Sequence, residues 1–548
     1  VTQSGPGNAL VRFTPTQDLA GRARFDFTVT DSAGDTWTQT FCLLISATAL
    51  QRDLTWAGDG ATNPWDLTTP VWRKSGVATV FGDGDNVTLD DNGSASPALA
   101  LTGTLQPASV LVDASTKNYT LAGPGLIGGA TTLTKRGEST LTLTGNNTWS
   151  GPTVIENGSV VMGLLGTAVN SSGTLGSGPL TLLGDASLVN AWIGTTHVLD
   201  MPIEVPAGAE PSIYTSRSFK HTGALTGGGV LTLFNQGTTG AVDLSGPWAD
   251  FAGTLRIVYA GSNGGVRAWF NGGAFNGLNN AHLDLVGANI IKPRTNSGGN
   301  TFGIGGLRSD DPNATLAGGS AGAPVYTIGG LNLDTTFAGK FQGNARLVKN
   351  GTGRLTLSGV CTHTGTTAVN AGHLAVDGSL GASTVTLASG AVLSGTTFGG
   401  PLNVAAGGIV EPGGNAGQAA GALTAGAITL AAPVLRLDLS ASPAGVNDRV
   451  IAAGGAAVNL SGATTITIRP IDGQLDAGSY PLVETTGALT STATFTGNLI
   501  NTPRQSFAFA TDAHSLKLVV TGAPVTLVWS GSAGDWDVAA TAAWKNGA

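Results

Sequence analysis

The sequence predicts an all-β chain that is built for most of its length as a right-handed parallel β-solenoid, or β-helix. Short runs of alternating apolar and polar residues recur along the chain, and Gly, Asn or Asp follows almost every run, as in strands separated by turns. Glycine contributes 84 of the 548 residues, roughly twice its average share. A segment of thirty residues also recurs, which is typical of folds that stack repeated units.

The composition excludes several other classes of protein. Hydrophobic residues make up 41% of the chain, enough to offset the entropy of ordering it, so a disordered chain is not expected. No apolar run approaches the ~20 residues that a membrane-spanning helix needs. The net charge is −8 and no basic stripe is present, so nucleic acid is not an expected partner.

Cysteine usage and the start of the sequence bear on export. Cys42 and Cys361 lie in unrelated segments, so each is predicted to be a buried or half-buried small side chain rather than half of a disulfide. Low contents of Cys, Met, Lys and Glu fit an exported bacterial protein. No signal segment begins at Val1, so an export signal is expected upstream of this fragment, and the anchor outside it.

Residues 1–50 are predicted to be a separate piece. The stretch 13–45 reads as a polar turn, a strand, the turn DSAGDT at 31–36 and a final strand. This pattern resembles the last strands of bacterial cadherin-like and immunoglobulin-like tandem domains. The resemblance implies that residues 1–50 are the C-terminal part of an immunoglobulin-like β-sandwich. It also makes the DSAGDT turn a candidate calcium site, because such domains sometimes bind calcium at their junctions.

A tryptophan pattern marks two module heads, at residues 51–120 and 527–548. The spacing of three tryptophans in the first head recurs about 472 residues later in the second. We therefore predict that 51–120 is the first segment of the solenoid and that 527–548 starts the next module. A buried structural cluster is favoured over carbohydrate stacking, although Trp offers the flat face and polar edge that stacking needs. The tryptophans are Trp56, Trp65 and Trp72, and Trp529, Trp536 and Trp544.

The solenoid proper is predicted for residues 121–435, with terminal coils over 436–526. Residues 133–162 align without gaps to 347–376, and eleven of the thirty positions are identical. Such a repeat is one coil or slightly more, because a single coil cannot bury its apolar face without neighbours. Coil corners need positive φ or close backbone approach, which glycine permits. The corner candidates are Gly145, Gly151, Gly158, Gly359, Gly365 and Gly372.

The two segments resemble the autotransporter-associated β-strand repeat, also called the passenger-associated transport repeat. The first segment departs from that pattern at Ser139 and Trp149, and the second at His363. The resemblance implies a passenger β-helix at the surface of a bacterium or outside it, with no catalytic residues to carry over. The positions of the second segment that fit are Leu347, Lys349, Gly351, Gly353, Leu355, Leu357, Gly359, Gly365, Thr367, Val369, Gly372 and Leu374.

The acidic run FGDGDNVTLDDNG at 81–93 is the best candidate metal site. Its carboxylates are hard oxygen ligands of the kind that Ca²⁺ prefers, although the spacing matches no EF-hand loop. The alternative is that these residues cap the corners around one short strand. No zinc site is predicted from the six scattered histidines. The candidate calcium ligands are Asp83, Asp85, Asp90 and Asp91.

The sequence thus favours a structural or adhesive extracellular module of a giant repetitive bacterial surface or fibre protein, acting as a rigid, protease-resistant rod. Its expected partners are neighbouring modules of the same chain or identical chains, and cell-surface glycans. The alternatives are a polysaccharide-active β-helix lyase or hydrolase and a glycan-binding module. No catalytic residue and no cofactor other than calcium is assigned. Candidates for the enzymatic alternative are Arg308, Asp310 and Asp311, and Asp448 with Arg449.

Overall fold

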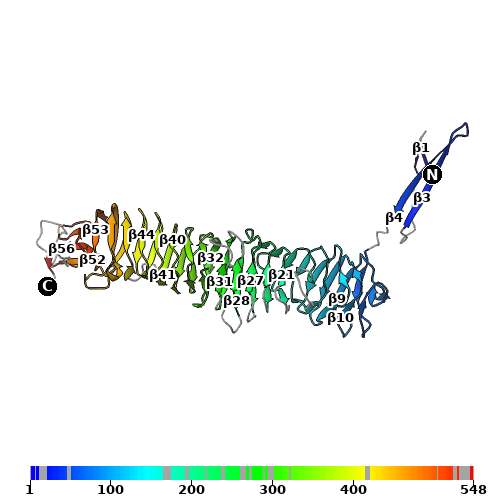
Figure 1. Cartoon of the computed structure of the whole chain (residues 1–548), viewed down its shortest axis with the longest axis horizontal. Helices are drawn as coiled ribbons and strands as arrows, with labels where there is room; N and C mark the ends of the chain where they lie inside the picture. The colour runs from blue at the N-terminus through cyan, green and yellow to red at the C-terminus, as the bar shows by residue number, and fades with distance from the viewer. Residues whose placement is uncertain are drawn as a thin grey trace. The chain divides into compact units, whose positions relative to one another are not determined.

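The computed structural model of the chain divides into two compact units, Val1–Thr153 with Gly173–Gly178, and Val154–Ser172 with Pro179–Ala548. Over the described residues the regular elements are strands and short 3₁₀ turns, with no α-helix (Figure 1). This agrees with the predicted all-β class. The structure describes residues 2–5, 8–10, 21–45, 51–163, 174–191, 197–215, 219–235, 241–259, 267–270, 275–287, 290–293, 301–319, 322–413, 420–502, 504–522, 527–529 and 544–546.

The first unit begins with antiparallel strand pairs. Strands β1 (Thr2–Gly5) and β2 (Asn8–Leu10) form one pair, and β3 (Gly21–Thr30) and β4 (Thr36–Ile45) form a longer hairpin. In the turn of this hairpin, the Asp31 carboxylate accepts hydrogen bonds from two backbone N–H groups, as in an Asx-turn. The predicted DSAGDT turn is therefore closed by Asp31 itself.

A short antiparallel segment opens the solenoid of the first unit. β5 pairs antiparallel with β7, which pairs antiparallel with β8. On its other edge β5 pairs parallel with β9, so the segment covers the edge of the first complete coil. The antiparallel strands are β5 (Asp53–Trp56), β7 (Trp72–Lys74) and β8 (Val77–Thr79), and β6 (Pro64–Trp65) between them in the sequence pairs parallel with β10.

Three-faced coils follow in the first unit. Val87, Val110 and Leu133 are paired in register on successive coils and all three are buried. This register of 23 residues keeps the same face of each strand inside, as a period-two pattern requires. The first face contains β9 (Asn86–Asp90), β12 (Ser109–Asp113) and β15 (Thr132–Arg136); the second β10 (Ala98–Leu101), β13 (Tyr119–Ala122) and β16 (Thr140–Leu143); the third β11 (Thr104–Leu105) and β14 (Leu126–Ile127).

In the second unit one long parallel sheet contributes a strand to every coil. Each strand pairs with its counterpart one coil later, which is the arrangement predicted for a parallel solenoid. Its strands are β18 (Ser159–Met162), β20 (Ser187–Asn190), β23 (Ser212–Thr215), β26 (Val230–Asn235), β28 (Thr254–Tyr259), β30 (Phe275–Val286), β32 (Thr301–Arg308), β34 (Val325–Ile328), β37 (Arg346–Lys349), β40 (Thr367–Val369), β42 (Val385–Leu387), β44 (Leu402–Val404), β47 (Ile428–Ala431), β50 (Val458–Ser461) and β53 (Leu489–Ser491).

The other faces of these coils are shorter parallel sheets. One contains β19 (Leu180–Leu182), β22 (Ile203–Val205) and β25 (Leu225–Gly227). A second contains β21 (His197–Leu199), β24 (Phe219–His221), β27 (Ala241–Leu244), β29 (Arg267–Phe270), β31 (Ile290–Pro293), β33 (Thr315–Ala317) and β36 (Lys340–Gln342). A third contains β35 (Thr335–Phe337), β38 (Arg354–Leu357), β41 (His373–Leu380), β43 (Val392–Phe398), β45 (Ile409–Pro412), β48 (Val434–Leu439), β51 (Ala463–Pro470) and β54 (Thr494–Gly497), with β39 (Val360–Cys361) beside β41.

The C-terminal end of the solenoid differs from the predicted terminal coils in its last strands. β46 (Ala422–Ala425), β49 (Arg449–Ala452) and β52 (Gly478–Thr485) still pair in parallel. β56 (Ser515–Thr521) then pairs antiparallel with β52 and with β55 (Ser506–Thr511). An uncovered coil edge would leave unpaired backbone groups that invite association with other chains. The antiparallel strands occupy that edge.

The two thirty-residue repeats contain the same order of strands. The first holds β15, β16, β17 (Thr153–Ile155) and β18, and the second β37, β38, β40 and β41. In the second copy Leu347 pairs with Thr367, so a coil closes after twenty residues and the repeat spans about one and a half coils. The predicted core leucines Leu141, Leu143, Leu355 and Leu357 are all buried.

Three pairs of predicted corner glycines occupy equivalent positions in the repeats. Gly158 and Gly372 have φ of 70° and 64°, a region that L side chains rarely adopt. At Gly365 an added Cβ would lie 2.1 Å from the Ala345 carbonyl oxygen, and at Gly151 2.3 Å from the Thr131 carbonyl oxygen. These last two glycines therefore let neighbouring coils approach.

The third pair, Gly145 and Gly359, gives a matched test. A Cβ at Gly359 would lie 2.1 Å from the Gly339 carbonyl oxygen, whereas at Gly145 the nearest atom is 3.5 Å away. We expect Gly359→Ala to lower the free energy of unfolding by about 1–3 kcal/mol, because backbone must shift. Gly145→Ala is expected to be within about 1 kcal/mol of the parent. Thermal unfolding followed by circular dichroism checks both, and equal effects would contradict the geometry.

Candidate functional site

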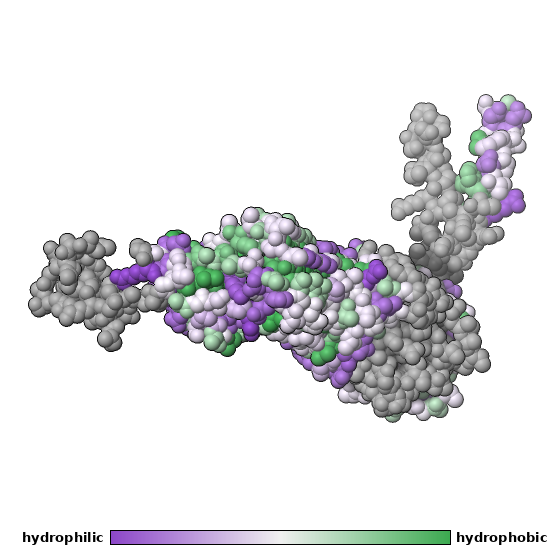
Figure 2. Space-filling model, turned by 60° about the vertical axis from the view of Figure 1, so that its left-hand side comes forward, coloured by the Kyte–Doolittle hydropathy of each residue, from purple (hydrophilic) through white to green (hydrophobic). Residues whose placement is uncertain are grey.

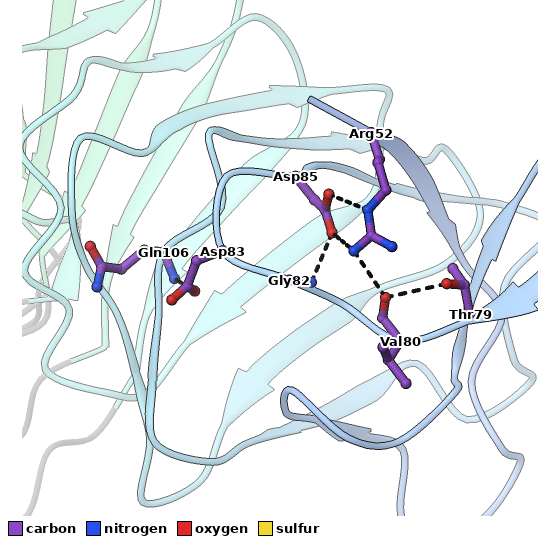
Figure 3. A network of polar contacts seen from close by, with 7 residues as sticks. All are labelled: Arg52, Thr79, Val80, Gly82, Asp83, Asp85 and Gln106. Carbon is purple, nitrogen blue, oxygen red and sulfur yellow. Dashed lines mark hydrogen bonds and ion pairs between the residues drawn. The ribbon is translucent and has the colours of Figure 1, made fainter. Parts of the chain in front are cut away.

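The acidic run at 81–93 forms β9 and the turns on both sides of it, and Figure 3 shows the first of these turns. Asp85 is buried and its carboxylate binds the Arg52 guanidinium through two contacts, Nε to Oδ1 at 2.7 Å and NH2 to Oδ2 at 2.5 Å. Oδ2 also accepts the backbone N–H of Gly82 at 2.8 Å. Arg52 donates further to the carbonyl of Val80 at 3.3 Å. Both oxygens of Asp85 are thus used by the fold.

Asp83 and Asp90 lie at separate places and bind separate donors. Asp83 accepts the backbone N–H of Gln106 at 2.8 Å, so it ties one coil to the next (Figure 3). Asp90 ends β9, and its Oδ1 accepts the backbone N–H of Asn92 at 2.8 Å. Each carboxylate satisfies backbone groups that a corner would otherwise leave unpaired.

Asp91 makes the densest set of these bonds. Its oxygens accept the backbone N–H groups of Ser115, Thr116 and Lys117 at 2.9–3.0 Å and the Thr116 hydroxyl at 2.7 Å. These bonds, that of Ser115 first, hold the pKa of the Asp91 carboxyl far below its usual range. All four predicted calcium ligands thus have other partners, and over the described residues no three His, Cys, Asp or Glu side chains are arranged to hold a metal.

The three tryptophans of the first module head are all buried. The Trp65 and Trp72 rings meet edge to face with centroids 5.0 Å apart, and Phe81 lies 5.6 Å from Trp65 and 6.1 Å from Trp72. Trp56 contacts Tyr119 edge to face at 5.6 Å. Such pairs add to the free energy gained from burying large apolar surfaces. The rings thus fill the interior of the first described coil.

The second module head repeats the backbone arrangement of the first. β57 (Leu527–Trp529) and β58 (Trp544–Asn546) pair antiparallel with Trp529 opposite Trp544. In the first head Trp56 is likewise opposite Trp72. The predicted equivalence of these tryptophans therefore extends to their strand pairing. Trp536 lies outside the described residues.

A buried lysine caps a corner in each repeat, a role that sequence reasoning missed. In the second repeat Lys349 Nζ donates to the carbonyls of Asn350, Gly351 and Ala371 at 2.7, 2.9 and 3.3 Å. Lys135 occupies the same position in the first repeat and donates to the two carbonyls that follow it. Burial lowers the pKa of each lysine to about 8. Each ammonium thus donates hydrogen bonds to turn carbonyls that lie outside the strand ladders.

The aromatic departures of the repeats preserve one hydrogen bond. Trp149 donates from Nε1 to the Thr153 hydroxyl at 3.1 Å. At the same place in the second repeat, His363 Nε2 lies 2.9 Å from the Thr367 hydroxyl, which also contacts Ser383 at 2.8 Å. The hydrogen bond at this corner therefore needs only a ring nitrogen that can donate or accept, on the residue four positions before the threonine. Burial lowers the pKa of His363 to about 4.

The residues suggested for an enzymatic alternative are dispersed among structural contacts. Arg308 Nε lies 3.6 Å from Asp284 Oδ2, and Asp311 Oδ1 accepts the backbone N–H of Asn313 at 2.7 Å, closing a turn. The structure gives no contact that brings Arg308 and Asp311 together. Asp310 is exposed in the same turn.

Asp448 and Arg449 likewise have different partners. Arg449 NH1 lies 3.3 Å from Glu484 Oε2. Burial raises the pKa of Asp448 to about 7, as catalytic acids require. Both of its oxygens nevertheless accept backbone N–H groups, from Gly421 at 2.7 Å and Asp438 at 2.8 Å.

Removal of a tryptophan ring tests the cluster. Trp65→Ala should destabilise the first coils by about 3–5 kcal/mol, because the cavity left in a packed core adds to the lost burial. Trp37→Ala is the control, since Trp37 on β4 is 61% exposed. Hydrogen exchange of the amides in β5 to β12 measures the effect locally. A change below about 1 kcal/mol for Trp65→Ala would show that the ring does not close the coil.

The buried lysine predicts a pH dependence. Lys349 has a pKa of about 8 in the fold, below the ordinary lysine value of 10.5, so between these values the unfolded chain binds more protons. The free energy of unfolding should therefore rise between pH 8 and 10.5, by at most about 1.4 kcal/mol per pH unit. Lys349→Met should remove this contribution, and Lys340→Met should retain it. Urea titrations across that range compare the slopes, and identical slopes for all three proteins would refute the assignment.

The comparisons with known proteins agree with this geometry. Residues 133–162 and 347–376 match the family described as Passenger-associated-transport-repeat. The chain is also 28% identical to the adhesin BmaC autotransporter of Brucella suis biovar 1 (strain 1330), in a match that covers 59% of this chain and 13% of the adhesin. Over the described residues, no helix has the length and apolar character to span a membrane. The resemblance seen in the sequence is confirmed: this chain carries passenger-associated transport repeats and is similar to an autotransporter adhesin.

Proposed function

We propose that this chain is an extracellular structural and adhesive module of a longer repetitive bacterial surface protein. The observation that carries the proposal is the joint presence of transport-type repeats and a continuous parallel solenoid in a chain similar to an adhesin. In this proposal the coils act as a rigid, protease-resistant support, and adhesion comes from side chains on their outer faces. Neighbouring modules of the same protein are the expected structural partners.

Continuous pairing supports the proposed rigidity. In the long sheet of the second unit, inner strands are hydrogen-bonded on both edges, with an in-register partner on each side. A protease needs a locally unfolded segment, and opening one coil here breaks ladders with two neighbours. The inward-pointing residues of these strands are buried, as in the register partners Val385, Leu402 and Ile428. Opening a coil would therefore also expose apolar side chains to water.

The outer surface supports a role in contact with other molecules. On the face shown in Figure 2, strongly hydrophilic and hydrophobic residues are interspersed with broad areas of intermediate hydropathy. This agrees with a chain in which only 11% of residues are charged. Such a surface presents hydroxyl and amide groups, which suit short-range hydrogen bonding. Long-range electrostatic attraction would need more charge of one sign.

One adhesion experiment tests both parts of the proposal. Polystyrene beads coated with the purified chain should bind cultured epithelial cells several-fold more than albumin-coated beads, and the soluble chain should compete. Trypsin treatment of the folded chain on the beads should leave this adhesion, whereas trypsin treatment after heat unfolding should abolish it. Adhesion no greater than that of albumin would refute the adhesive role. Loss after trypsin treatment of the folded chain would refute the protease-resistant support.

A further inference from the structure

The outer face of the sheet that contains β45, β48 and β51 carries a polar cavity. Its volume is about 160 Å³, and it lies in the second unit. Six of its lining residues carry the argument. They are Glu411, Arg436, Asp438, Asp448, Thr467 and Arg469.

In-register stacking builds this cavity from three successive coils. Arg436 is paired with Thr467, and two residues further along Asp438 is paired with Arg469. Glu411 follows a residue that pairs with Leu435, so it lies beside Arg436. Residues that are remote in sequence thus become neighbours on one face.

Opposite charges alternate between the coils. Arg436 NH1 donates to Glu411 Oε1 at 2.7 Å, which uses one of the five N–H donors of that guanidinium. Arg469 binds the Asp438 carboxylate through Nε at 2.7 Å and also through NH2. The side chain of Asp438 is 8% exposed, whereas that of Arg436 is 49% exposed. Fixed acceptors therefore lie beneath exposed donors.

The charges of this cavity exclude two classes of ligand. Three carboxylates face two guanidinium groups, so an anionic ligand would meet no excess of positive charge. A divalent cation is not favoured either, because no three acidic, His or Cys side chains of the described residues are arranged to hold one. Both guanidinium groups would also oppose its entry.

A neutral polyol fits what remains. Each hydroxyl of such a ligand can donate to a carboxylate and accept from a guanidinium or from Thr467. Hydrogen bonds to charged partners are stronger than those between neutral groups. A volume of about 160 Å³ corresponds to about five water molecules at about 30 Å³ each. One six-membered sugar ring can take their place.

We propose that this cavity binds a single neutral hexopyranose unit of a surface glycan or polysaccharide. The proposal rests on the adhesive function proposed above and names the class of ligand for it. Arg436 and Thr467 bind the sugar hydroxyl groups directly. Glu411 and Asp438 accept from the sugar and hold the two arginines in place. Asp448 forms one wall, fixed by the backbone of Gly421 and Asp438.

Binding of simple glycosides to the purified 548-residue chain tests the site. The probes are the methyl α-D-pyranosides of glucose, galactose and mannose, with N-acetylneuraminic acid as an anionic comparison. Saturation-transfer NMR and calorimetry should detect at least one neutral glycoside with a Kd of about 1 mM. The anionic sugar should not bind.

Matched variants separate the site from the scaffold. Arg436→Gln and Thr467→Val should each weaken glycoside binding by about tenfold or more, through lost hydrogen bonds. Thr465→Val lies on the same strand, paired with Val434 and outside the cavity, and should bind as the parent does. Circular dichroism and thermal midpoints confirm folding, and Thr467→Val remains informative if Arg436→Gln fails to fold.

Two results overturn the proposal. One is the absence of binding by all three neutral glycosides, and the other is unchanged binding in both cavity variants. Neither result would refute the proposed function, because the adhesion of coated beads is measured independently of these sugars. Tighter binding of N-acetylneuraminic acid than of every neutral glycoside would also refute the predicted neutral ligand.

Discussion

In-register parallel pairing is the constraint on which the rest of this structure depends. Equivalent side chains on successive coils lie about 4.8 Å apart, so like charges at equivalent positions would repel across every rung. The chain meets this in two ways. Outward positions hold uncharged residues, as in the paired series Thr386, Asn403 and Thr429. At some charged positions the next coil supplies an opposite charge, as for Arg256 and Asp284 at 2.9 Å. The low charge content of the sequence follows from this geometry.

Corners impose the second constraint, because there the backbone leaves the ladders. Three devices satisfy it: glycines where coils approach closely, carboxylates such as Asp91 that accept several N–H groups, and ammonium groups such as Lys349 that donate to several carbonyls. The carboxylates and the ammonium groups have opposite roles: a carboxylate accepts from backbone N–H groups that have no strand partner, and an ammonium donates to carbonyl groups that have none. The lysine is the costlier device, since desolvation disfavours its charged form. Its three carbonyl partners offset that cost.

The sequence was sufficient to predict the solenoid and its repeats, since period-two alternation and turn glycines are local features. Other features depend on which residues stacking brings together. Lys349 was recognised as part of a motif, but a lysine in a sequence gives no sign of being buried. The acidic run predicts a calcium site, whereas in the structure Asp83 and Asp91 accept hydrogen bonds from the next coil and Asp85 binds Arg52. The sequence indicates Asp448 as a candidate residue. It does not indicate Arg469, because strand register alone places Arg469 beside Asp438.

A regular solenoid gains a distinct site where its regularity is interrupted. Between β48 and β49 the chain makes a tight loop, in which Asn447 Oδ1 accepts the Ser440 N–H at 2.7 Å and Nδ2 donates to three carbonyls at 3.1 Å. This loop ends at Asp448, which is thereby fixed against Asp438. Without the loop, the outer face would continue as an open ladder of side chains. The loop adds a wall to that ladder and creates a cavity, so an insertion tolerated by the coils becomes the means by which a repetitive scaffold acquires specificity.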